Sequence, residues 1–390
     1  MAYIILGDNF SFPDGDAATN RVYTYAKGFL ANNKNVAVIC FKNDYKTNVN
    51  GEIEGIRYYH PINQSKRNEY FLIRNWYKVV KYYNAYSLVR KLNKSEKTEA
   101  IIVYTKLPVT HIFSWFLARM FGTLLIIENS EHPLRYHRHG FLKKLTGELS
   151  LLIELKTLDG ILLITQNLID FYKARLKGER KILHVPSTVD PTRFLQPKTS
   201  HPGYKYIGYF GSINFDRDNV DLLIKAFAKI HSRYPEINLI LGGIYGDEEK
   251  KLVEDLVKQL GIESEVHLLK YLPREEVVQY IINAYILVMV RRDDPDTNSS
   301  FPCKLTEYLA TGNPVITVKV GEIPNYLSDG VNAFLINPGD IDGLSGKLDT
   351  VLSDFTLSLK VAQKGKELTD TVFNYRYQAK RIIEFIDKIK

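Results

Sequence analysis

The stretch AYILVMVRRDDPDTNSSFPCKLTEYLATGNPVITV, residues 284–318, decides the fold class of this 390-residue chain. Its apolar beginning, Ala284–Met289, predicts a buried strand. A polar loop follows and leads into a short helix over Lys304–Ala310, which Gly312 ends before the next apolar strand, Pro314–Val318. Strand, helix and strand in this order are typical of a βαβ unit, so the stretch indicates an α/β protein.

The same alternation of short β-rich runs and helical patterns continues on both sides of this stretch. In the first half it predicts strands over residues 3–6, 36–41, 100–104, 123–128, 160–165 and 181–185, and helices over 18–32, 71–92, 109–121, 141–156 and 167–176. In the second half it predicts strands over 204–210, 238–242, 266–269, 284–289, 314–318 and 333–336, and helices over 221–232, 247–260, 274–282, 304–310 and 375–390. No repeat of 20–50 residues is present, which excludes solenoids and propellers.

A polar, proline-rich stretch interrupts this pattern near the middle of the chain. Residues 196–203, QPKTSHPG, have the composition of a linker. We therefore expect one doubly wound α/β domain over residues 1–195 and a second over 204–372. Two such domains form a cleft, and ligands of doubly wound sheets bind beyond the carboxyl ends of the strands.

The overall composition excludes several classes of protein. Hydrophobic residues make up 45% of the chain and charged residues 25%, which excludes collagen-like and disordered chains. The two cysteines, Cys40 and Cys303, cannot build a disulfide framework or a thiolate metal site, so a reducing cytoplasm is expected. Residues 1–7 lack the basic start of a signal peptide, and no apolar run approaches the ~20 residues of a membrane span.

The charge is distributed unevenly. The chain carries a net charge of +8, but residues 1–200 carry an excess of positive charge and residues 201–390 a small excess of negative charge. A basic half predicts a polyanionic partner such as anionic lipid headgroups. Basic and aromatic residues interleave over Arg74–Tyr83 and Arg135–Leu145. They fit an interfacial membrane contact, a phosphate-rich acceptor, or two core helices with solvated basic faces. Nucleic acid is not expected, because no nucleic-acid-binding motif accompanies the charge.

Lys304 and Glu307 suggest one half of a nucleotide site. They lie three residues apart and therefore share one face of the predicted helix. A helix N-terminus with a lysine in its first turn offers N–H groups and a cation to a phosphate. A carboxylate one turn further can accept hydrogen bonds from the vicinal hydroxyls of a ribose. The alternative is a solvated Lys–Glu pair on a helix surface.

The loop after the first strand of the second half supplies a complementary feature. The strand ends at Gly211, and a polar loop that carries Arg217 leads to an amphipathic helix. Glycine lets a ligand approach the backbone closely, and Arg217 would neutralise a diphosphate from the side opposite Lys304. The alternative is an ordinary βα turn with a surface arginine.

Taken together, these motifs resemble the retaining GT-B nucleotide-sugar transferases of glycosyltransferase family 4, also called glycosyl transferases group 1. Residues 301–316 are similar to the family's E-x7-E region, and 321–340 to the stretch that follows it. Residues 209–217 resemble its diphosphate loop, and 185–194 the segment that ends its N-terminal domain. The resemblance spans nearly the whole chain. It implies an α/β GT-B fold, with two Rossmann-like domains facing a central cleft and a final helix, residues 373–390, crossing back to the N-terminal domain.

The resemblance also implies the residues of the donor site. Glu307 matches the glutamate that contacts the donor ribose, and Lys304 and Arg217 match cationic positions at the diphosphate. The donor-binding set expected in this way is Gly15, Gly211, Ser212, Arg217, Ser299, Ser300, Phe301, Lys304, Leu305 and Glu307. The chain departs from the family pattern twice, because the first glutamate falls on Ser299 and a usual arginine falls on Ser212. Nearby carboxylates that could substitute are Asp293, Asp294 and Asp296.

In the first half, two loops after predicted strands are expected to serve the acceptor. The loop Asp14–Arg21 lacks the GxGxxG fingerprint of a dinucleotide site. The second loop follows the strand 123–127, and there His132 resembles the family histidine that contacts the transferred sugar. The acceptor-binding set is Asp16, Arg21, Glu131 and His132, and the catalytic set is His132, Arg217 and Lys304. The alternatives are a plain βα turn and a histidine that stabilises its own loop.

The function implied is a retaining glycosyltransferase that moves a sugar from a nucleotide-diphosphate donor to a saccharide, expected to be lipid-linked, in bacterial surface-polysaccharide biosynthesis. No metal or other cofactor is expected. The expected location is the cytoplasm, with a peripheral position at the inner face of the cytoplasmic membrane. Two other functions stay open. One is a GT-B sugar-nucleotide epimerase or hydrolase, and the other is a non-catalytic nucleotide-sugar-binding protein, which Ser212 and Ser299 motivate.

Overall fold

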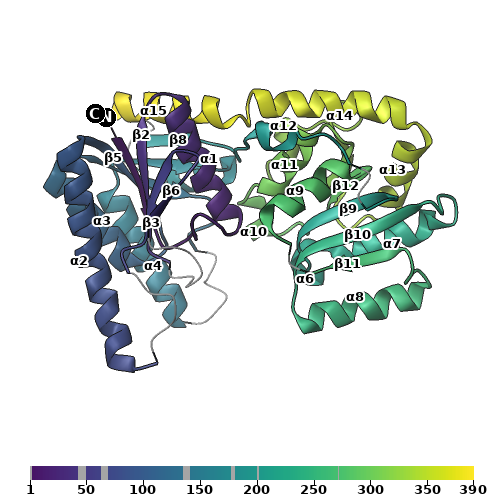
Figure 1. Ribbon diagram of the computed structural model, residues 1–390, viewed down its shortest axis with the longest axis horizontal. Helices are drawn as coiled ribbons and strands as arrows, with labels where there is room; N and C mark the ends of the chain where they lie inside the picture. The colour runs from purple at the N-terminus through teal and green to yellow at the C-terminus, as the bar shows by residue number, and fades with distance from the viewer. Residues whose placement is uncertain are drawn as a thin grey trace. The chain divides into compact units, whose positions relative to one another are not determined.

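The computed structural model describes residues 2–42, 50–62, 69–134, 141–176, 181–199, 202–270 and 272–390, with only the backbone at 141–143 and 274. The chain forms two compact units (Figure 1). The first contains residues 1–188 together with Tyr375–Lys390, and the second contains Val189–Asn374. The division therefore falls after Thr188, seven residues before the boundary expected from the sequence. The hydroxyl of Thr188 lies 2.6 Å from that of Thr24 in the first unit, which explains why the chain up to this point belongs to it.

The first unit is built on a mostly parallel sheet. Its strands are β1 (Ala2–Gly7), β2 (Asn35–Cys40), β3 (Asn50–Ile53), β4 (Ile56–Tyr59), β5 (Thr98–Tyr104), β6 (Leu124–Asn129), β7 (Gly160–Leu163) and β8 (Ile182–His184). The strand order is β3-β4-β2-β1-β5-β6-β7-β8, and only the β3–β4 pair is antiparallel. The order reverses between β1 and β5, so the topological switch point of this sheet lies there.

Helices cover both faces of this sheet (Figure 1). They are α1 (Ala17–Ala31), α2 (Phe71–Ser95), α3 (Pro108–Phe121), α4 (Phe141–Thr157), α5 (Gln166–Lys173) and α15 (Tyr375–Ile389). Helices α1 and α15 pack together over one face, where the rings of Tyr3 and Phe29 stack 4.5 Å apart within the core. Gly28 permits this close packing, because a Cβ there would lie 2.5 Å from the Cβ of Ala379. Helix α3 packs against both α2 and α4.

The sequence did not predict the hairpin formed by β3 and β4. Its turn residues, Glu54 and Gly55, both have positive φ angles of 48° and 81°, as a two-residue hairpin turn requires. Glutamate is an uncommon residue in that conformation, and each strand has only four residues, so the local sequence carries little hairpin signal.

The second unit is a doubly wound parallel sheet. Its strands are β9 (Lys205–Ser212), β10 (Ile237–Ile244), β11 (Val266–Leu269), β12 (Ile286–Met289), β13 (Val315–Val318) and β14 (Phe334–Ile336). The strand order is β11-β10-β9-β12-β13-β14, and all neighbours are parallel. This is the order 3-2-1-4-5-6 of a dinucleotide-binding sheet, and its switch point lies between β9 and β12.

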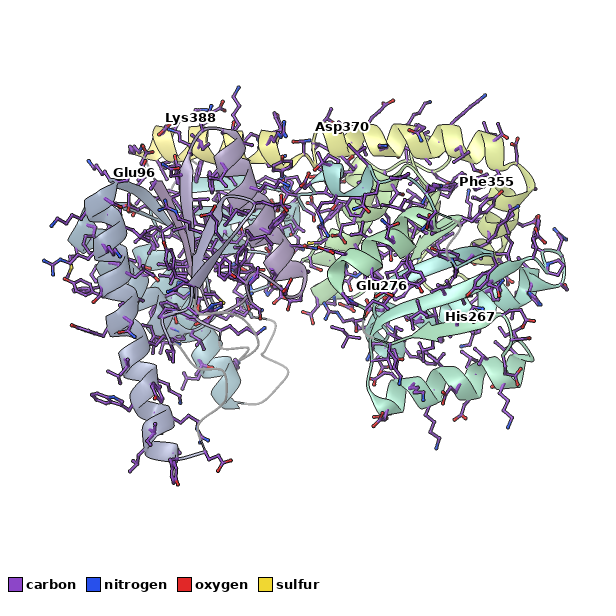
Figure 2. The ribbon with its side chains drawn as sticks, in the orientation of Figure 1. Glu96, His267, Glu276, Phe355, Asp370 and Lys388 are labelled. Atoms are coloured by element: carbon purple, nitrogen blue, oxygen red, sulfur yellow. The ribbon has the colours of Figure 1, made fainter. Side chains whose placement is uncertain are left out.

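The connections of the second unit are mainly helical. They are the 3-10 helix η3 (Pro191–Phe194) and the helices α6 (Phe215–Asp218), α7 (Val220–His231), α8 (Asp247–Leu260), α9 (Arg274–Asn283), α10 (Pro295–Asn298), α11 (Cys303–Thr311), α12 (Ile323–Tyr326), α13 (Ile341–Ser353) and α14 (Phe355–Asp370). Phe355 and Asp370 mark the two ends of α14 in Figure 2. The predicted α/β fold class, with two Rossmann-like sheets, is confirmed.

The sequence did not predict α13 and α14 either. Each begins at an aspartate whose carboxylate accepts a hydrogen bond from the backbone three residues on: Asp340 from Gly343 and Asp354 from Leu357. Two glycines, Gly343 and Gly346, lower the helix propensity of α13, which explains why the pattern was missed. Within the described residues, no helix combines the length and apolar character needed to cross a membrane.

Candidate functional site

Three loops meet at the switch point of the second sheet. Strand β9 ends with Gly211 and Ser212, Arg291 follows β12, and helix α11 begins at Cys303. Each of these segments lies at the carboxyl end of a parallel strand or at the N-terminus of a helix. In a sheet of this order, that edge is where ligands bind. We call it the switch-point corner.

Lys304 lies at the centre of the switch-point corner. Its Nζ donates a hydrogen bond of 2.8 Å to Tyr209 Oη and lies 3.8 Å from Asp218 Oδ1. A Cβ added to Gly211 would lie 2.5 Å from the same Nζ, so glycine is needed for the lysine to rest against β9. The lysine side chain is 19% exposed, which leaves its ammonium group partly accessible to a ligand.

The surroundings of Lys304 weaken its hold on its proton. Burial lowers the pKa of Lys304 to about 8, and the positive charges of Arg291 and Arg217 lower it further while the Asp218 carboxylate opposes them. Burial and the charge of Arg217 also lower the pKa of Arg291. The Arg292 N–H donates a hydrogen bond of 3.3 Å to the Arg217 carbonyl, so the loops that carry Arg217 and Arg291 adjoin. An anion bound beside Lys304, Arg291 and Arg217 would offset the repulsion among their positive charges.

Arg291, Tyr209 and Asp218 are members of this corner that the sequence analysis missed. Arg291 is 5% exposed and donates a hydrogen bond of 3.2 Å to Ser300 Oγ. Its position directly after the apolar run 284–290 is the signal that could have identified it, because residues there lie at the ligand-binding edge. Tyr209 and Asp218 carry no such signal, since their roles depend on Lys304, which is distant in sequence.

Glu307 lies one turn after Lys304 on α11. Its Oε1 lies 3.5 Å from Arg193 Nη1 in η3, and both side chains are 18% exposed. Tyr308 fixes α11 against β9, because its hydroxyl accepts a hydrogen bond from the Phe210 N–H and donates one to the Phe210 carbonyl. The helix therefore holds Lys304 and Glu307 at defined positions beside the end of β9.

Four other residues of the expected donor set are placed differently. Leu305 is fully buried, and the ring of Phe301 packs against those of Tyr326 and Phe373, so both side chains belong to the core. Ser299 is 2% exposed, and its hydroxyl donates to the Pro295 carbonyl. Ser212 is exposed at the end of β9. The side chains of Leu305 and Phe301 are thus corrected from donor contacts to packing residues.

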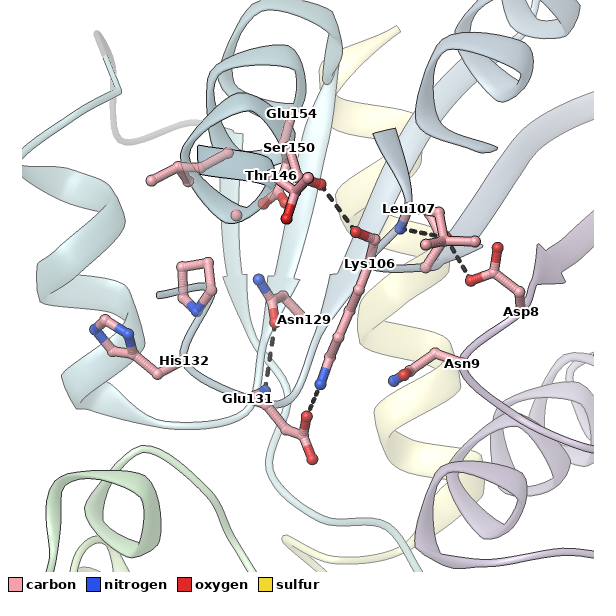
Figure 3. A pocket seen from close by; sticks show the side chains of 14 residues that line it. Asp8, Asn9, Lys106, Leu107, Asn129, Glu131, His132, Thr146, Ser150 and Glu154 are labelled. Carbon is pink, nitrogen blue, oxygen red and sulfur yellow. Dashed lines mark hydrogen bonds and ion pairs between the residues drawn. The ribbon is translucent and has the colours of Figure 1, made fainter. Parts of the chain in front are cut away.

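The first unit has a cavity of about 450 Å³ at the corresponding edge of its own sheet (Figure 3). Asp8 and Asn9 reach it from the end of β1, Lys106 follows β5, and Asn129 ends β6. Helix α4 contributes a further wall with Thr146, Gly147, Ser150, Leu151 and Glu154. The lining is rich in hydroxyl, amide and carboxylate groups, which suit a ligand that carries several hydroxyl groups.

A buried polar network forms one side of this cavity. Tyr172 donates a hydrogen bond to Glu154 Oε1 and accepts one of 2.7 Å from Asn129. Burial raises the pKa of Glu154 to about 7 and lowers that of His111, whose Nε2 lies 3.8 Å from Glu154, to about 4. Glu154 could not be selected from the sequence, because it lies inside α4 and its orientation toward the cavity depends on how α4 packs in the fold.

Glu131 and His132 both line this cavity, as Figure 3 shows. Glu131 forms an ion pair with Lys106. Nδ1 of His132 accepts a hydrogen bond of 3.2 Å from the Leu134 N–H, and its ring packs edge-on against Phe171 at 4.7 Å. The histidine thus stabilises its own loop and also borders the cavity.

The residues of the loop before α1 make contacts within the protein, and the expected contacts of Gly15 and Asp16 with substrates stay predictions. Asp16 caps helix α1 by accepting a hydrogen bond of 3.1 Å from Ala18 N. A Cβ at Gly15 would lie 2.2 Å from the hydroxyl of Thr19, so Gly15 allows the tight first turn of this helix. None of the loop's residues lines the cavity described above.

Arg21 is corrected from an acceptor contact to a structural residue. Its guanidinium is 2% exposed and donates to Glu128 at 2.6 Å and to the carbonyl groups of Val185 and Pro186. The carboxylate of Glu128 also accepts hydrogen bonds from Tyr25 and Ser130. The hydrogen bonds of Arg21 and Glu128 thus all go to groups of the protein itself. The Arg21–Glu128 ion pair joins α1 to β6, and Arg21 also joins α1 to the segment after β8.

Some sequence predictions lie partly outside the described residues. Of the basic stretch Arg135–Leu145, residues 135–140 are not described, nor are the side chains of 141–143. In the part of the chain that is described, no group of three or more His, Cys, Asp or Glu side chains is placed to hold a metal ion. Neither Cys40 nor Cys303 forms a disulfide bond.

A parallel sheet with cations at its switch point is the arrangement of a nucleotide-binding α/β domain. Residues 192–368, which form most of the second unit, match the family model of glycosyl transferases group 1. A D-inositol 3-phosphate glycosyltransferase of Corynebacterium urealyticum is 29% identical over 185 residues, covering 46% of this chain and 42% of that protein. The MMP alpha-(1->4)-mannosyltransferase of Mycolicibacterium hassiacum is 25% identical over 209 residues, covering 53% and 48%. The chain thus spans less than half the length of these relatives.

Solved structures show that the likeness in fold extends over the whole chain. HepE from Anabaena in complex with UDP has a TM-score of 0.70 and 15% identity and covers 100% of both chains. Sucrose-phosphate synthase from Thermosynechococcus elongatus has a TM-score of 0.73 and 16% identity, covering 100% of this chain and 99% of that one. The GT-B fold expected from the resemblance is confirmed.

Proposed function

We propose that this protein is a glycosyltransferase that uses a nucleoside-diphosphate sugar as donor and binds its diphosphate at the switch-point corner. The observation that carries the proposal is the gathering of Lys304, Arg291 and Arg217 at that corner. These three cations outnumber the carboxylates that neighbour them, Asp218 and Asp294. The first turn of α11 adds backbone N–H groups, which favour a phosphate at a helix N-terminus.

The same cations supply the chemistry of transfer. When the bond between the sugar C1 and the diphosphate oxygen breaks, that oxygen takes the electron pair and becomes more negative. Lys304 and the two arginines stabilise this charge where it develops. The acceptor oxygen forms the new bond to C1, and its proton passes to the leaving diphosphate. In the retaining course that we propose, the acceptor attacks the face from which the diphosphate leaves, and no metal ion takes part.

We propose that the polar cavity of the first unit receives the acceptor. Glu131 and Lys106, which are paired to each other, together with Asn129 and Ser150 offer donors and acceptors to sugar hydroxyl groups. His132 borders this cavity and is proposed to contact the transferred sugar. The relatives include a D-inositol 3-phosphate glycosyltransferase and a mannosyltransferase, which supports a hydroxyl-rich acceptor. We propose a saccharide or lipid-linked saccharide as this acceptor, in cytoplasmic assembly of cell-surface polysaccharide.

Incubation of the purified protein with a panel of nucleoside-diphosphate sugars tests this function. Each donor is offered with and without simple and lipid-linked saccharides, and products are followed by mass spectrometry. Transfer to an acceptor, with the anomeric configuration of the donor kept, is the expected result. Turnover that needs no acceptor would instead indicate an epimerase or hydrolase, and binding without turnover would indicate a binding protein.

Substituting alanine for Gly211 is expected to weaken nucleoside diphosphate binding at least about tenfold without unfolding the protein. The new Cβ would displace the Lys304 ammonium group, which lies 2.5 Å from it, and a lost charged hydrogen bond is worth about 1.5–3 kcal/mol. Isothermal titration calorimetry measures the affinity. Gly346→Ala in α13 is the matched control, because a Cβ added there would meet no atom within 4 Å apart from its chain neighbours and the backbone of its own helix. Equal losses in both variants would contradict the placement of the ligand beside Gly211.

Nucleoside diphosphate affinity is expected to fall roughly tenfold between pH 7 and pH 9. Lys304, whose pKa is about 8, is mainly protonated at pH 7 and mainly neutral at pH 9 in the free protein. Because the ligand binds the protonated form, binding at pH 8–9 should take up a proton. Titration calorimetry in buffers of different ionisation enthalpy measures this uptake. Lys304→Arg should remove both effects, and a pH dependence unchanged in that variant would refute the assignment.

A further inference from the structure

We propose that the outward side of helices α2, α3 and α4 is a docking surface for an anionic membrane. We call this side the three-helix face. The inference goes beyond sugar transfer and does not depend on it, because it rests on the exposed side chains of the first unit alone. Helix α3 packs against both α2 and α4, so the three helices adjoin on one side of the sheet (Figure 1).

Helix α2 exposes a row of apolar side chains in its N-terminal half. Leu72, Trp76, Val79 and Tyr83 are 80%, 65%, 61% and 69% exposed. Their spacing of i, i+4, i+7 and i+11 places them in one row on a helix. Such a row normally faces the protein core, yet here only Ala85 and Val89 of α2 are buried.

Helix α3 exposes mainly apolar side chains to solvent. Its outward row contains Val109, Ile112 and Phe116, which are 60%, 49% and 48% exposed. Its inward side is mixed, with the polar Thr110, His111 and Ser114 and the apolar Leu117 and Ala118 all completely buried. A surface helix of a protein that meets only water exposes mainly polar side chains. The outward side of α3 is therefore built to meet an apolar environment.

Helix α4 continues the apolar surface. Leu145, Leu149 and Leu152 are 51%, 48% and 48% exposed and again follow i, i+4, i+7 spacing. Across the three helices, these rows form an apolar area of a kind that soluble monomers rarely leave uncovered. The inward side of α4 lines the polar cavity described above, so the same helix joins the three-helix face to that cavity.

Charge identifies the occupant of this face. Residues 71–95 include six Lys or Arg and no Asp or Glu, and residues 108–121 include Arg119 and no acidic residue. Residues 141–157 include three Lys and two Glu, of which Glu154 lines the cavity, so the three helices together are strongly basic. Lys78, Arg90 and Lys91 are exposed beside the apolar rows. A second copy of the chain, docked by twofold symmetry, would bring these like charges together. Anionic lipid headgroups match them, while the aromatic and aliphatic side chains enter the interface below the headgroups.

The two tryptophans of the chain report directly on this surface. Trp76 and Trp115 are the only tryptophans in the sequence, and both lie on the three-helix face, 65% and 39% exposed. Vesicles of phosphatidylcholine and phosphatidylglycerol should shift the tryptophan emission of the purified protein to shorter wavelength. Brominated acyl chains should quench that emission, and added salt should weaken the binding. Vesicles of phosphatidylcholine alone should bind far less.

Two pairs of variants complete the test. Leu72→Ser with Phe116→Ser should weaken vesicle binding at least about tenfold, because two large apolar side chains no longer insert. Ile244→Ser with Leu357→Ser is the control, since these exposed side chains lie in the second unit.

Lys78→Glu with Lys91→Glu should abolish the preference for anionic vesicles, while Lys251→Glu on α8 should not. Circular dichroism and thermal unfolding confirm that each variant is folded.

Several results would overturn the inference. These are no spectral shift with anionic vesicles at low salt, equal binding to anionic and neutral vesicles, or equal loss of binding in the control variants. Analytical ultracentrifugation addresses the second copy as occupant. A dimer that Leu72→Ser with Phe116→Ser abolishes, in a protein that does not bind vesicles, would show that the face pairs two chains instead.

Discussion

Replacing Lys304 with alanine is expected to lower the rate of sugar transfer at least about 10–100-fold while leaving the protein folded. The ammonium group lies beside Gly211, where the leaving diphosphate is proposed to bind, and its charge acts on the transition state more than on the bound donor. The fold decrease in kcat should therefore be larger than the fold increase in KM for the donor. Stability should change little, because a partly buried lysine with a lowered pKa gains little from its position.

Two variants give this experiment its controls. Lys225→Ala removes a lysine of the same unit that pairs with Asp221 on α7, and it should leave turnover unchanged. Lys304→Arg keeps a positive charge with a different shape, so it should recover part of the rate. Steady-state kinetics with the best donor of the panel measures all three. Wild-type rates in Lys304→Ala would remove this lysine from the mechanism.

Replacing Arg21 with methionine is expected to destabilise the protein by about 3–5 kcal/mol. The guanidinium is 2% exposed and satisfies the Glu128 carboxylate and the carbonyl groups of Val185 and Pro186. Methionine fills much of the same volume but leaves Glu128 as a buried charge without its cation. Denaturant unfolding measures the loss. The variant should keep its affinity for nucleoside diphosphates at temperatures where it stays folded, because its role is structural.

Arg119→Met is the matched control for this loss. Arg119 pairs with Asp159 at 2.7 Å, but it is 49% exposed, and an exposed pair contributes at most about 1 kcal/mol. Glu128→Gln added to Arg21→Met should recover part of the stability, since the buried carboxylate becomes a neutral amide. A loss in Arg21→Met no larger than that in Arg119→Met would contradict the buried ion pair.

Most of the fold could be predicted from the sequence because its elements carry strong periodicity. The run 284–318 is an example, since its apolar strand, capped helix and second strand appear as β12, α11 and β13. The β3–β4 hairpin and helices α13 and α14 could not be predicted in this way. Their local signals are weak, with a Glu–Gly turn in one case and two glycines inside a helix in the other. Their stability comes from tertiary contacts, because β4 pairs with β2, α13 packs against α7 and α14 packs against α11, and a local pattern does not contain such contacts.

The candidate site could be predicted where topology alone decides position. Gly211 lies at the end of β9 and Lys304 on the helix that comes after β12, and these strands are neighbours in a doubly wound sheet, so the approach of the two residues is a consequence of the strand order. Arg21 also follows a strand, but its direction is set by Glu128, 107 residues away. Sequence position places a residue at the edge of a sheet. It does not determine whether the side chain points into a cavity or beneath the neighbouring strands.

A nucleoside diphosphate is proposed to bind where Lys304, Arg291 and Gly211 meet. A crystal structure with the tightest-binding member of a panel of nucleoside diphosphates would locate the ligand. The expected result is a diphosphate within hydrogen-bond distance of the Lys304 ammonium group and against the Gly211 backbone, with the ribose at Glu307. Failure of every nucleotide to bind, or a diphosphate seated away from the N-terminus of α11, would contradict the account.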